Sequence, residues 1–207
     1  QPKYNIRFDV PVLCSAEALV RWHHPQKGLL MPDAFIPLLE EKGKIFDLDS
    51  YVWLKAAMQV KKWKEKLKIT VPVSVNVSKG DLKSDVSIWY LENLIKEAGI
   101  SHDELLLEIT ESVYDDHEKA LRDRINALRD LGFLIEMDDF GTGYSSLSLA
   151  KKLPIDAMKI DMRFVKDAFQ AKKDTGMIEI ILKICDYLKV LSIAEGVENK
   201  GQLLSLK

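Results

Sequence analysis

Acidic and amide side chains recur at the ends of short apolar runs along this chain. Alternate residues of a β-strand face the same side, so polar residues two apart in such a run lie on one face. The residues in such positions are Glu17, Arg21, Asn76, Glu108, Asp138, Lys159, Asp161 and Glu195. If the runs are strands of one barrel, these side chains converge in an oxygen-rich pocket that contains one lysine and one arginine.

The four carboxylates of this set, those of Glu17, Glu108, Asp138 and Glu195, would repel one another strongly at low dielectric constant. A divalent cation removes this repulsion. Because the donors are oxygen atoms without a His or Cys cluster, Mg²⁺ or Mn²⁺ is favoured over zinc. Proteins usually hold Mg²⁺ through a few carboxylates and the phosphates of a substrate. The pattern therefore predicts phosphate chemistry, and two ions roughly 3.5–4 Å apart would suit a phosphodiester.

The stretch IEMDDFGTGYSSL, residues 135–147, permits two interpretations. A glycine-rich turn can bind a phosphate through its N–H groups, whereas paired aspartates at a strand end can bind a hard metal ion. The phosphate interpretation is weaker, because the Walker pattern requires a Gly-Lys-Ser/Thr ending and the dinucleotide fingerprint requires glycine where Ser146 stands. Asp138 and Asp139 point to opposite sides of an ideal strand, but where the strand ends they can serve neighbouring ions.

Structural roles compete with these assignments. A single acidic residue in a strand is more often a rim or solvent-facing group. Lys159 and Asp161 also fit a structural salt bridge, and Arg21 also fits a cap on a barrel rim. The number of polar residues at matching strand ends is what favours a site.

The apolar runs alternate with helical patterns along the chain. Predicted strands span residues 4–10, 14–22, 70–78, 104–110, 133–140, 156–161 and 191–198. Predicted helices span residues 32–42, 47–66, 89–99, 117–132, 145–153, 176–190 and 199–207. This alternation indicates an α/β fold with a parallel sheet. The polar strand ends, and the lack of a G-x-G-x-x-G after the first strand, favour a (β/α)8 TIM-type barrel over a doubly wound sheet. A barrel needs one more strand, so we expect a single domain, residues 1–207, that stops before its last βα unit.

The bulk composition narrows the class of protein. The 207 residues carry 30 basic and 32 acidic side chains, whereas a binder of nucleic-acid polymers is normally markedly basic. Cys14 and Cys185 lack C-x-x-C spacing, which disfavours a disulfide or a zinc site and is typical of a reducing cytoplasm. No apolar run reaches the roughly 18 residues of a membrane span. We therefore expect a cytoplasmic domain, which could belong to a membrane-anchored protein, and the absence of an initial Met indicates a fragment.

Seven motifs occur along the chain in this order: AEALVRW, FIPLLEEKG, VSVNVS, LLLEITES, MDDFGTGYSSL, LPIDAMKID and IAEGVE. With these motifs the chain resembles the EAL domains, which are bacterial cyclic di-GMP phosphodiesterases. The resemblance implies a barrel with an antiparallel first strand. It also implies hydrolysis of one phosphodiester bond of cyclic di-GMP to linear pGpG with Mg²⁺ or Mn²⁺, which ends second-messenger signalling.

The resemblance assigns a role to each matching position. The metal ligands would be Glu17, Asn76, Glu108, Asp138, Asp139 and Glu195, the last directly or through water. The residues acting in catalysis would be Lys159, Glu195 and Glu17. Lys159 would position or deprotonate the attacking water, with Asp161 beside it, and Arg21 would contact a substrate phosphate. Glu111 would brace the loop after DDF, which the family uses for metal binding and dimerisation.

Two departures accompany the resemblance. The family continues into a last strand with a glutamine in a Gln-Gly-Tyr context; this sequence lacks it, and Gln202 is not its equivalent. The chain also begins inside the family's first strand. The family further implies a homodimer and an upstream sensor or GGDEF domain. The EAL glutamate and the DDF aspartates favour an enzyme over a catalytically silent cyclic di-GMP receptor, and the dense carboxylates disfavour a pure interaction scaffold.

Overall fold

The computed structural model describes residues 1–111, 119–140, 154–170 and 176–206 of the chain. The predicted helix at 145–153 and the Gly-Thr-Gly turn at 141–143 lie outside the described residues.

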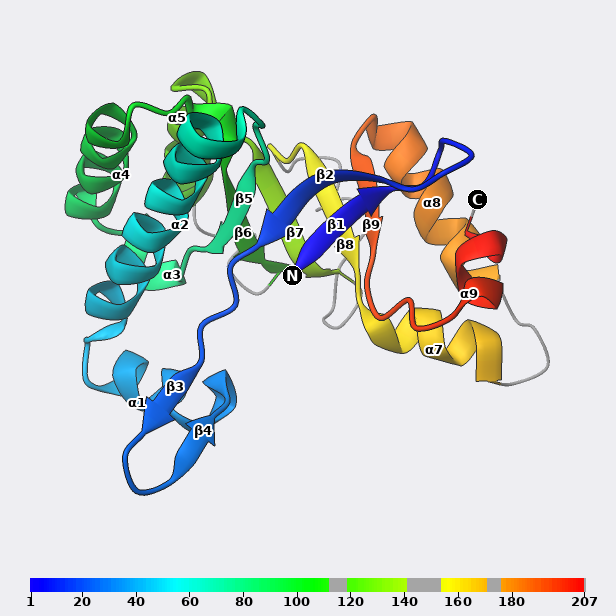
Figure 1. Ribbon diagram of the computed structural model, residues 1–207, viewed down its shortest axis with the longest axis horizontal. Coiled ribbons are helices and arrows are strands. Elements are labelled where there is room, and N and C mark those ends of the chain that lie inside the picture. Colours follow the sequence, from blue (N-terminus) through cyan, green and yellow to red (C-terminus); the bar gives the residue numbers. More distant parts are fainter. Residues whose placement is uncertain (112–118, 141–153, 171–175, 207) are drawn as a thin grey trace.

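A curled, seven-stranded sheet forms the centre of this described part (Figure 1). In spatial order its strands are β1 (Pro2–Asn5), β2 (Val12–Glu17), β5 (Val73–Asn76), β6 (Leu105–Thr110), β7 (Ile135–Phe140), β8 (Ala157–Ile160) and β9 (Leu191–Ala194). β1 pairs antiparallel with β2, and each later neighbouring pair is parallel. The predicted strands are confirmed in order, although several are shorter than predicted, and the antiparallel first strand is confirmed.

Eight α-helices lie in the described ranges. They are α1 (Ile36–Glu41), α2 (Ile45–Leu67), α3 (Lys79–Leu82), α4 (Asp85–Ala98), α5 (Lys119–Asp130), α7 (Met162–Gln170), α8 (Gly176–Leu188) and α9 (Lys200–Ser205). Of these, α2 packs against β5 and α8 against β9. In Figure 1, α2, α4 and α5 lie on one side of the sheet, and α7, α8 and α9 lie on the other, beyond β9. Within the described ranges, no helix is both long and apolar enough to cross a membrane.

Two helices were not predicted. α3 begins at Ser78, whose hydroxyl accepts from the N–H of Asp81, while the Asp81 carboxylate accepts from the N–H of Ser78. This reciprocal capping box satisfies two N–H groups at the helix start and stabilises a helix too short for a visible hydrophobic period. α7 packs Val165 in a small core with Ile178 of α8.

The predicted strand 14–22 is wrong at its end. β2 stops at Glu17, and Trp22 begins a separate antiparallel hairpin of β3 (Trp22–His24) and β4 (Gly28–Leu30), where only a loop was expected. The Trp22 ring packs edge-on against Phe35, with ring centres 5.7 Å apart. Figure 1 shows this hairpin projecting away from the main sheet. The hairpin is therefore anchored to the segment before α1 rather than to the strand that carries Glu17.

The core explains how polar strand ends are held rigidly. β6 is buried on both faces, as expected for a central parallel strand. Leu105, Leu107 and Ile109 are buried on one face, and Leu106 and Glu108 are buried on the other. The fully buried Trp53 of α2 donates its indole N–H to the carbonyl of Asn76 at 2.9 Å. Helix α2 is thereby fastened to the end of β5, directly where a predicted site residue lies.

Candidate functional site

Four of the predicted carboxylates surround the ammonium group of Lys159. The shortest distances from its Nζ atom to carboxylate oxygens are 2.9 Å to Glu195, 3.0 Å to Asp138, 3.2 Å to Glu108 and 3.5 Å to Glu17. Lys159 is only 1% exposed, so these ion pairs form away from bulk water. The structure thus brings together residues from β2, β6, β7 and β8 and from the segment after β9.

Strand register explains this convergence. Asn76 lies beside Glu108 across β5 and β6, and Asp138 lies beside Thr110 across β6 and β7. Lys159 lies beside Ile193 across β8 and β9, and Glu195 follows two residues later. Because the strands are parallel, their carboxyl ends meet at one edge of the sheet, where barrel enzymes carry their sites.

Asp139 reaches the same cluster through an irregularity of β7. The register with β8 shifts between Met137 and Phe140, and Asp139 has a left-handed φ of 57°. Its N–H donates to the Asp138 carboxylate at 2.9 Å. The Asp139 side chain is exposed. Partial burial, together with the charges of Asp138, Asp161 and Glu195, raises its pKa. A strained, bulged strand end therefore gathers two successive aspartates that an ideal strand would separate.

Electrostatics tie the lysine to the carboxylates. Burial alone would favour a neutral amine, but the charges of Glu108, Asp138, Glu195 and Glu17 outweigh it and hold the pKa of Lys159 above its ordinary value. Burial and the charge of Glu108 raise the pKa of Glu17 to about 7, against the opposing effect of Lys159. The cluster therefore contains more negative charge than one ammonium group can balance.

A second lysine, Lys3, lies within the same group of charges and was missed by the sequence analysis. Its Nζ atom is 2.7 Å from Oε1 of Glu108 and 2.6 Å from Oε2 of Glu136. The expected pocket with one lysine and one arginine is thus wrong in its lysine count. The signal was present in part, because Glu136 lies two residues before Asp138 on the same strand. The predicted first strand began at residue 4 and excluded Lys3.

The donor atoms of the cluster, carboxylate oxygens, are of the type that binds a divalent cation such as Mg²⁺ or Mn²⁺. Glu17, Glu108, Asp138 and Glu195 all bring a carboxylate oxygen within 3.5 Å of one point, the Lys159 ammonium. Oε2 of Glu108 is buried and, within the described residues, has no hydrogen-bond partner. A buried carboxylate oxygen of this kind calls for a cation or a donor. Among the described residues no three such side chains form a ready metal-binding group, and the Lys159 ammonium lies between the carboxylates instead.

The other predicted residues, Asn76, Arg21 and Glu111, are found in different settings. Asn76 is exposed at the end of β5. Arg21 is half-buried and donates to the carbonyl of Val20 at 2.8 Å. Glu111 is buried directly after β6, but the loop that it was expected to brace lies outside the described residues.

The structural salt bridge considered for Lys159 and Asp161 is not formed in the described structure. Asp161 instead accepts from the backbone N–H of Arg163 at 2.7 Å and from its Nε at 2.9 Å. These contacts, set against burial, hold the pKa of Asp161 below its ordinary value. The two residues have separate partners because β8 ends at Ile160, so the alternation that would place them on one face stops before Asp161.

Gly196 supports the neighbouring Glu195. Its φ is 68°, and a Cβ atom at this position would lie 2.6 Å from Cβ of Met162. Both the left-handed backbone and the close approach of α7 require glycine. The backbone beside Glu195 is therefore held against the first residue of α7.

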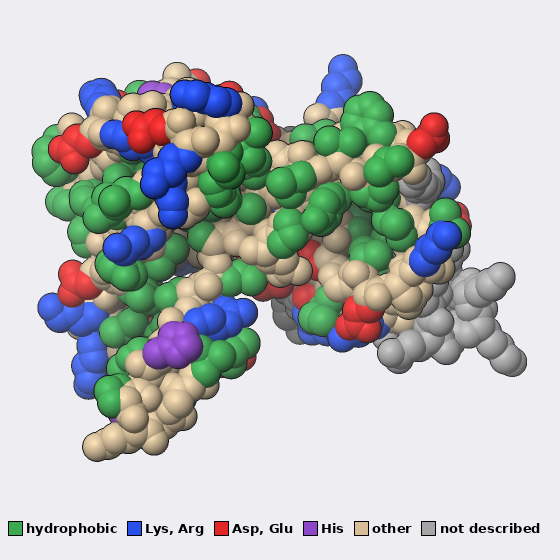
Figure 2. Space-filling view, viewed as in Figure 1, with side chains coloured by type: hydrophobic (Ala, Val, Ile, Leu, Met, Phe, Trp, Pro, Cys, Tyr) green, Lys and Arg blue, Asp and Glu red, His purple; other side chains and the backbone are tan. Residues whose placement is uncertain are grey.

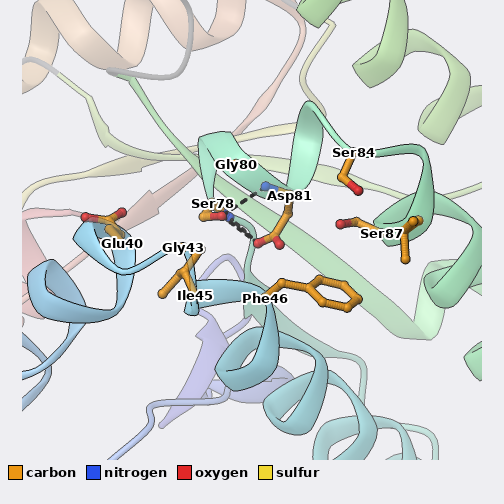
Figure 3. Close-up of a pocket in the computed structure, with 10 residues that line it drawn as sticks. Glu40, Gly43, Ile45, Phe46, Ser78, Gly80, Asp81, Ser84 and Ser87 are labelled. Carbon is orange, nitrogen blue, oxygen red and sulfur yellow. Dashed lines mark hydrogen bonds between the residues drawn. The ribbon is translucent and has the colours of Figure 1, made fainter.

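A separate pocket of about 530 Å³ lies between the start of α2, α3 and the start of α4 (Figure 3). Figure 3 shows Ser78 and Asp81 hydrogen-bonded to each other in its lining. Nearby, burial and Asp81 raise the pKa of Asp49 to about 9, so Asp49 holds a proton at neutral pH. None of the residues described as lining this pocket belongs to the Lys159 cluster. Two of them, Ser78 and Asp81, form the capping box of α3.

The model of the EAL domain family matches residues 1–207. The chain belongs to the EAL domain family. The resemblance inferred from the seven motifs is thereby confirmed. The α/β fold is also confirmed: the solved structure titled "PaMucR Phosphodiesterase, c-di-GMP complex" superposes with a TM-score of 0.87 at 30% identity, covering all of this chain and 84% of that chain.

Curated relatives are longer proteins. The cyclic di-GMP phosphodiesterase PdeR of Escherichia coli (strain K12) is 37% identical over 96% of this chain and 30% of that protein. The cyclic di-GMP phosphodiesterase NbdA of Pseudomonas aeruginosa is 35% identical over 92% of this chain and 24% of that protein. This EAL domain chain therefore spans about a quarter to a third of these relatives.

Proposed function

We propose that this EAL domain hydrolyses one phosphodiester bond of cyclic di-GMP to linear pGpG in a metal-dependent reaction. The observation that carries the proposal is the gathering of Glu17, Glu108, Asp138 and Glu195 around Lys159 at one edge of the sheet. The names of PdeR and NbdA support cyclic di-GMP as the substrate. Hydrolysis would end the signal that this second messenger carries.

The carboxylate edge would hold Mg²⁺ or Mn²⁺, as two ions. The ligands we propose are Glu17, Asn76, Glu108, Asp138, Asp139 and Glu195. Bound there, the ions supply Lewis-acid stabilisation of the negative charge that develops on a phosphodiester. Arg21 contacts a phosphate oxygen of the substrate, Asp161 lies at the edge of the same site, and Glu111 braces the loop after residue 140.

Lys159 acts as a hydrogen-bond donor that positions the attacking water. The surrounding carboxylates keep its pKa high, which favours an ammonium donor over a neutral amine base. The water gives up a proton as its oxygen forms a bond to phosphorus, the bond from phosphorus to one ribose oxygen breaks, and that ribose oxygen takes up the proton. In this proposal Lys159 on β8 and Glu17 on β2 act together on the reacting water.

The length of the relatives supports a larger assembly. Because the chain spans a third or less of PdeR and NbdA, we propose that an upstream sensor or GGDEF domain controls it. The proposal includes a cytoplasmic location, because cyclic di-GMP would be made there by a neighbouring cyclase. It also includes a homodimer.

The test is pGpG release from cyclic di-GMP with Mg²⁺ or Mn²⁺, after EDTA, and after the metal is restored. Lys159→Met should lower kcat by about 100-fold or more. Lys64→Met is the matched control, because Lys64 also forms a 2.8 Å ion pair, with Glu104, far from the cluster. Tight binding of cyclic di-GMP without hydrolysis would favour the catalytically silent receptor, and full-rate turnover by Lys159→Met would remove the lysine from the mechanism.

A further inference from the structure

The Lys3 side chain extends from β1 to residues on three other strands of the curled sheet. It donates to Oγ of Ser74 on β5 at 2.8 Å, to Oε1 of Glu108 on β6 at 2.7 Å and to Oε2 of Glu136 on β7 at 2.6 Å. A lysine ammonium has three donors, and all three are used here. The Lys3 side chain is 9% exposed, and those of Glu108 and Glu136 are 0% and 6% exposed. This is a buried network, not a surface ion pair.

Strand pairing explains why a cation is needed at this point. Glu108 and Glu136 are direct register partners across β6 and β7, so two buried carboxylates stand side by side. Like charges in this arrangement destabilise a sheet. Ser74 donates its hydroxyl to Oε2 of Glu136 at 2.8 Å, but a hydroxyl supplies no charge. Lys3 is the cation that touches both carboxylates in the described structure.

The direction of the Lys3 side chain is associated with a bulge in β2, the strand that pairs with β1. The pairing of β1 with β2 shifts register immediately after Lys3, where Lys3 lies opposite Ser15 and Tyr4 lies opposite Leu13. The extra residue in β2 is Cys14, whose thiol donates to the Lys3 carbonyl at 3.3 Å. Bulges commonly redirect a side chain next to a functional site. β1 is thereby shaped to send Lys3 into the sheet interior.

The two carboxylate oxygens of Glu108 have different contacts. Oε1 accepts from Lys3 at 2.7 Å and lies 3.2 Å from Nζ of Lys159. Oε2 is buried and unpartnered within the described residues. Rotation of the carboxylate would break the contacts of Oε1 with two cations. The two lysines thus hold Oε1, and no described group holds Oε2.

We propose that Lys3 is a positioning residue for the metal ligand Glu108, which it holds through Oε1 so that Oε2 remains available to the divalent cation. The inference rests on the proposed function in one respect, that Glu108 binds the metal. Lys3 touches neither substrate nor metal and acts through Glu108. The rival role is purely structural: Lys3 would serve only as the counter-ion of Glu136. Supports of ligating carboxylates typically affect metal affinity or activity by about 10- to 100-fold.

A charge-balanced pair of substitutions separates the two roles. Lys3→Met alone removes a cation and should lower both the melting temperature and the affinity for Mn²⁺. Lys3→Met with Glu136→Gln removes one charge of each sign and keeps an acceptor for Ser74, so the melting temperature should recover most of its loss. Its affinity for Mn²⁺, measured by calorimetry without nucleotide, should stay about 10-fold or more below that of the unsubstituted chain. Recovery of Mn²⁺ affinity together with stability would establish the counter-ion role and overturn the proposal.

Matched controls complete the design. Lys42→Met with Glu41→Gln removes an exposed ion pair of the same charges and should leave Mn²⁺ affinity unchanged. Lys3→Arg keeps the charge but changes the donor geometry, so it should fold and bind Mn²⁺ more weakly; wild-type affinity in that variant would also contradict the proposal. Mn²⁺ binding without pGpG release would reject the proposed function and leave this inference standing. Failure of the unsubstituted chain to bind Mn²⁺ would overturn the inference itself.

Discussion

At the scale of single residues, the chain places ionisable groups in two contrasting environments. The carboxylates around Lys159 form ion pairs with it, and Glu108 also pairs with Lys3, so that these buried charges are stabilised by direct contact with a cation. Asp49, which is 8% exposed in α2, instead lies next to the Asp81 carboxylate, and burial and this neighbour raise its pKa. Its burial and the charge of Asp81 favour the neutral acid. One type of side chain therefore serves as a charged group in one place and as a hydrogen-bond donor in the other.

This environment predicts a pH dependence of stability. The pKa of Asp49 is raised from 3.8 to about 9 on folding, so the folded state binds more protons than the unfolded state between these values. The stabilisation is complete below pH 3.8 and is lost as the pH rises towards 9. The slope from one proton is at most about 1.4 kcal/mol per pH unit. In urea titrations at pH 6 and pH 8, Asp49→Asn should lose less stability with rising pH than the unsubstituted chain; parallel losses would contradict the assignment.

At the scale of elements, irregular strand ends position the functional groups. The bulge of β7 turns Asp139 toward the cluster, and the bulge between β1 and β2 directs Lys3 inward. The turn after β9 depends on Gly196, which holds Glu195 against α7. The regular parts of the strands form the framework of the sheet, and the bulges and the glycine turn set the directions of the functional side chains.

Gly196→Ala tests the turn after β9. The added Cβ atom would meet Met162 at 2.6 Å in a backbone conformation that disfavours alanine. We expect a loss of about 1–3 kcal/mol in the free energy of unfolding, and weaker cyclic di-GMP hydrolysis through displacement of Glu195. Gly80→Ala in α3 is the control, since its φ is ordinary and the added Cβ atom would meet its nearest neighbour, Oγ of Ser78, at 3.5 Å, an ordinary contact distance. Equal stability and turnover in the two variants would argue against a special role for Gly196.

At the scale of the whole molecule, burial is uneven across the sheet. β6 and β8 are buried along nearly their whole length, whereas the residues of β9 are exposed or half-buried. β1 and β2 also expose apolar side chains, including Tyr4 and Val12, and Figure 2 shows hydrophobic surface over this part of the molecule. Local stability should follow this gradient.

Amide hydrogen exchange measures the gradient directly. Amides of β6 and β7 should exchange most slowly, because both strands have parallel partners on each side and a buried core around them. Amides of β9 and of the hairpin β3–β4 should exchange faster, by about 100-fold or more, as the hairpin shares no strand pairing with the main sheet. Uniform protection across all of these strands would show that the sheet opens only as a whole.

The convergence of Glu17, Glu108, Asp138 and Lys159 was predictable because alternation and parallel order are both legible in a sequence. The EAL motifs added residue roles that spacing alone left open. Two features at the cluster were not predictable. The Lys3 contacts depend on an antiparallel register with a bulge, and the path of Asp139 depends on a left-handed backbone at a non-glycine residue. Both are set by tertiary packing, which local propensity does not encode.

The Lys3 network also bears on the order of folding. Its contacts with Glu108 and Glu136 join residues separated by 105 and 133 positions in the chain. Closing such large loops carries an entropic cost that is recovered only when the intervening strands are already ordered, and contacts of this range slow folding. The carboxylate edge should therefore assemble late, after β5, β6 and β7 have paired. A partly folded or partly synthesised chain would have a hydrophobic core but no complete site. Metal binding would therefore occur only after the chain has folded completely.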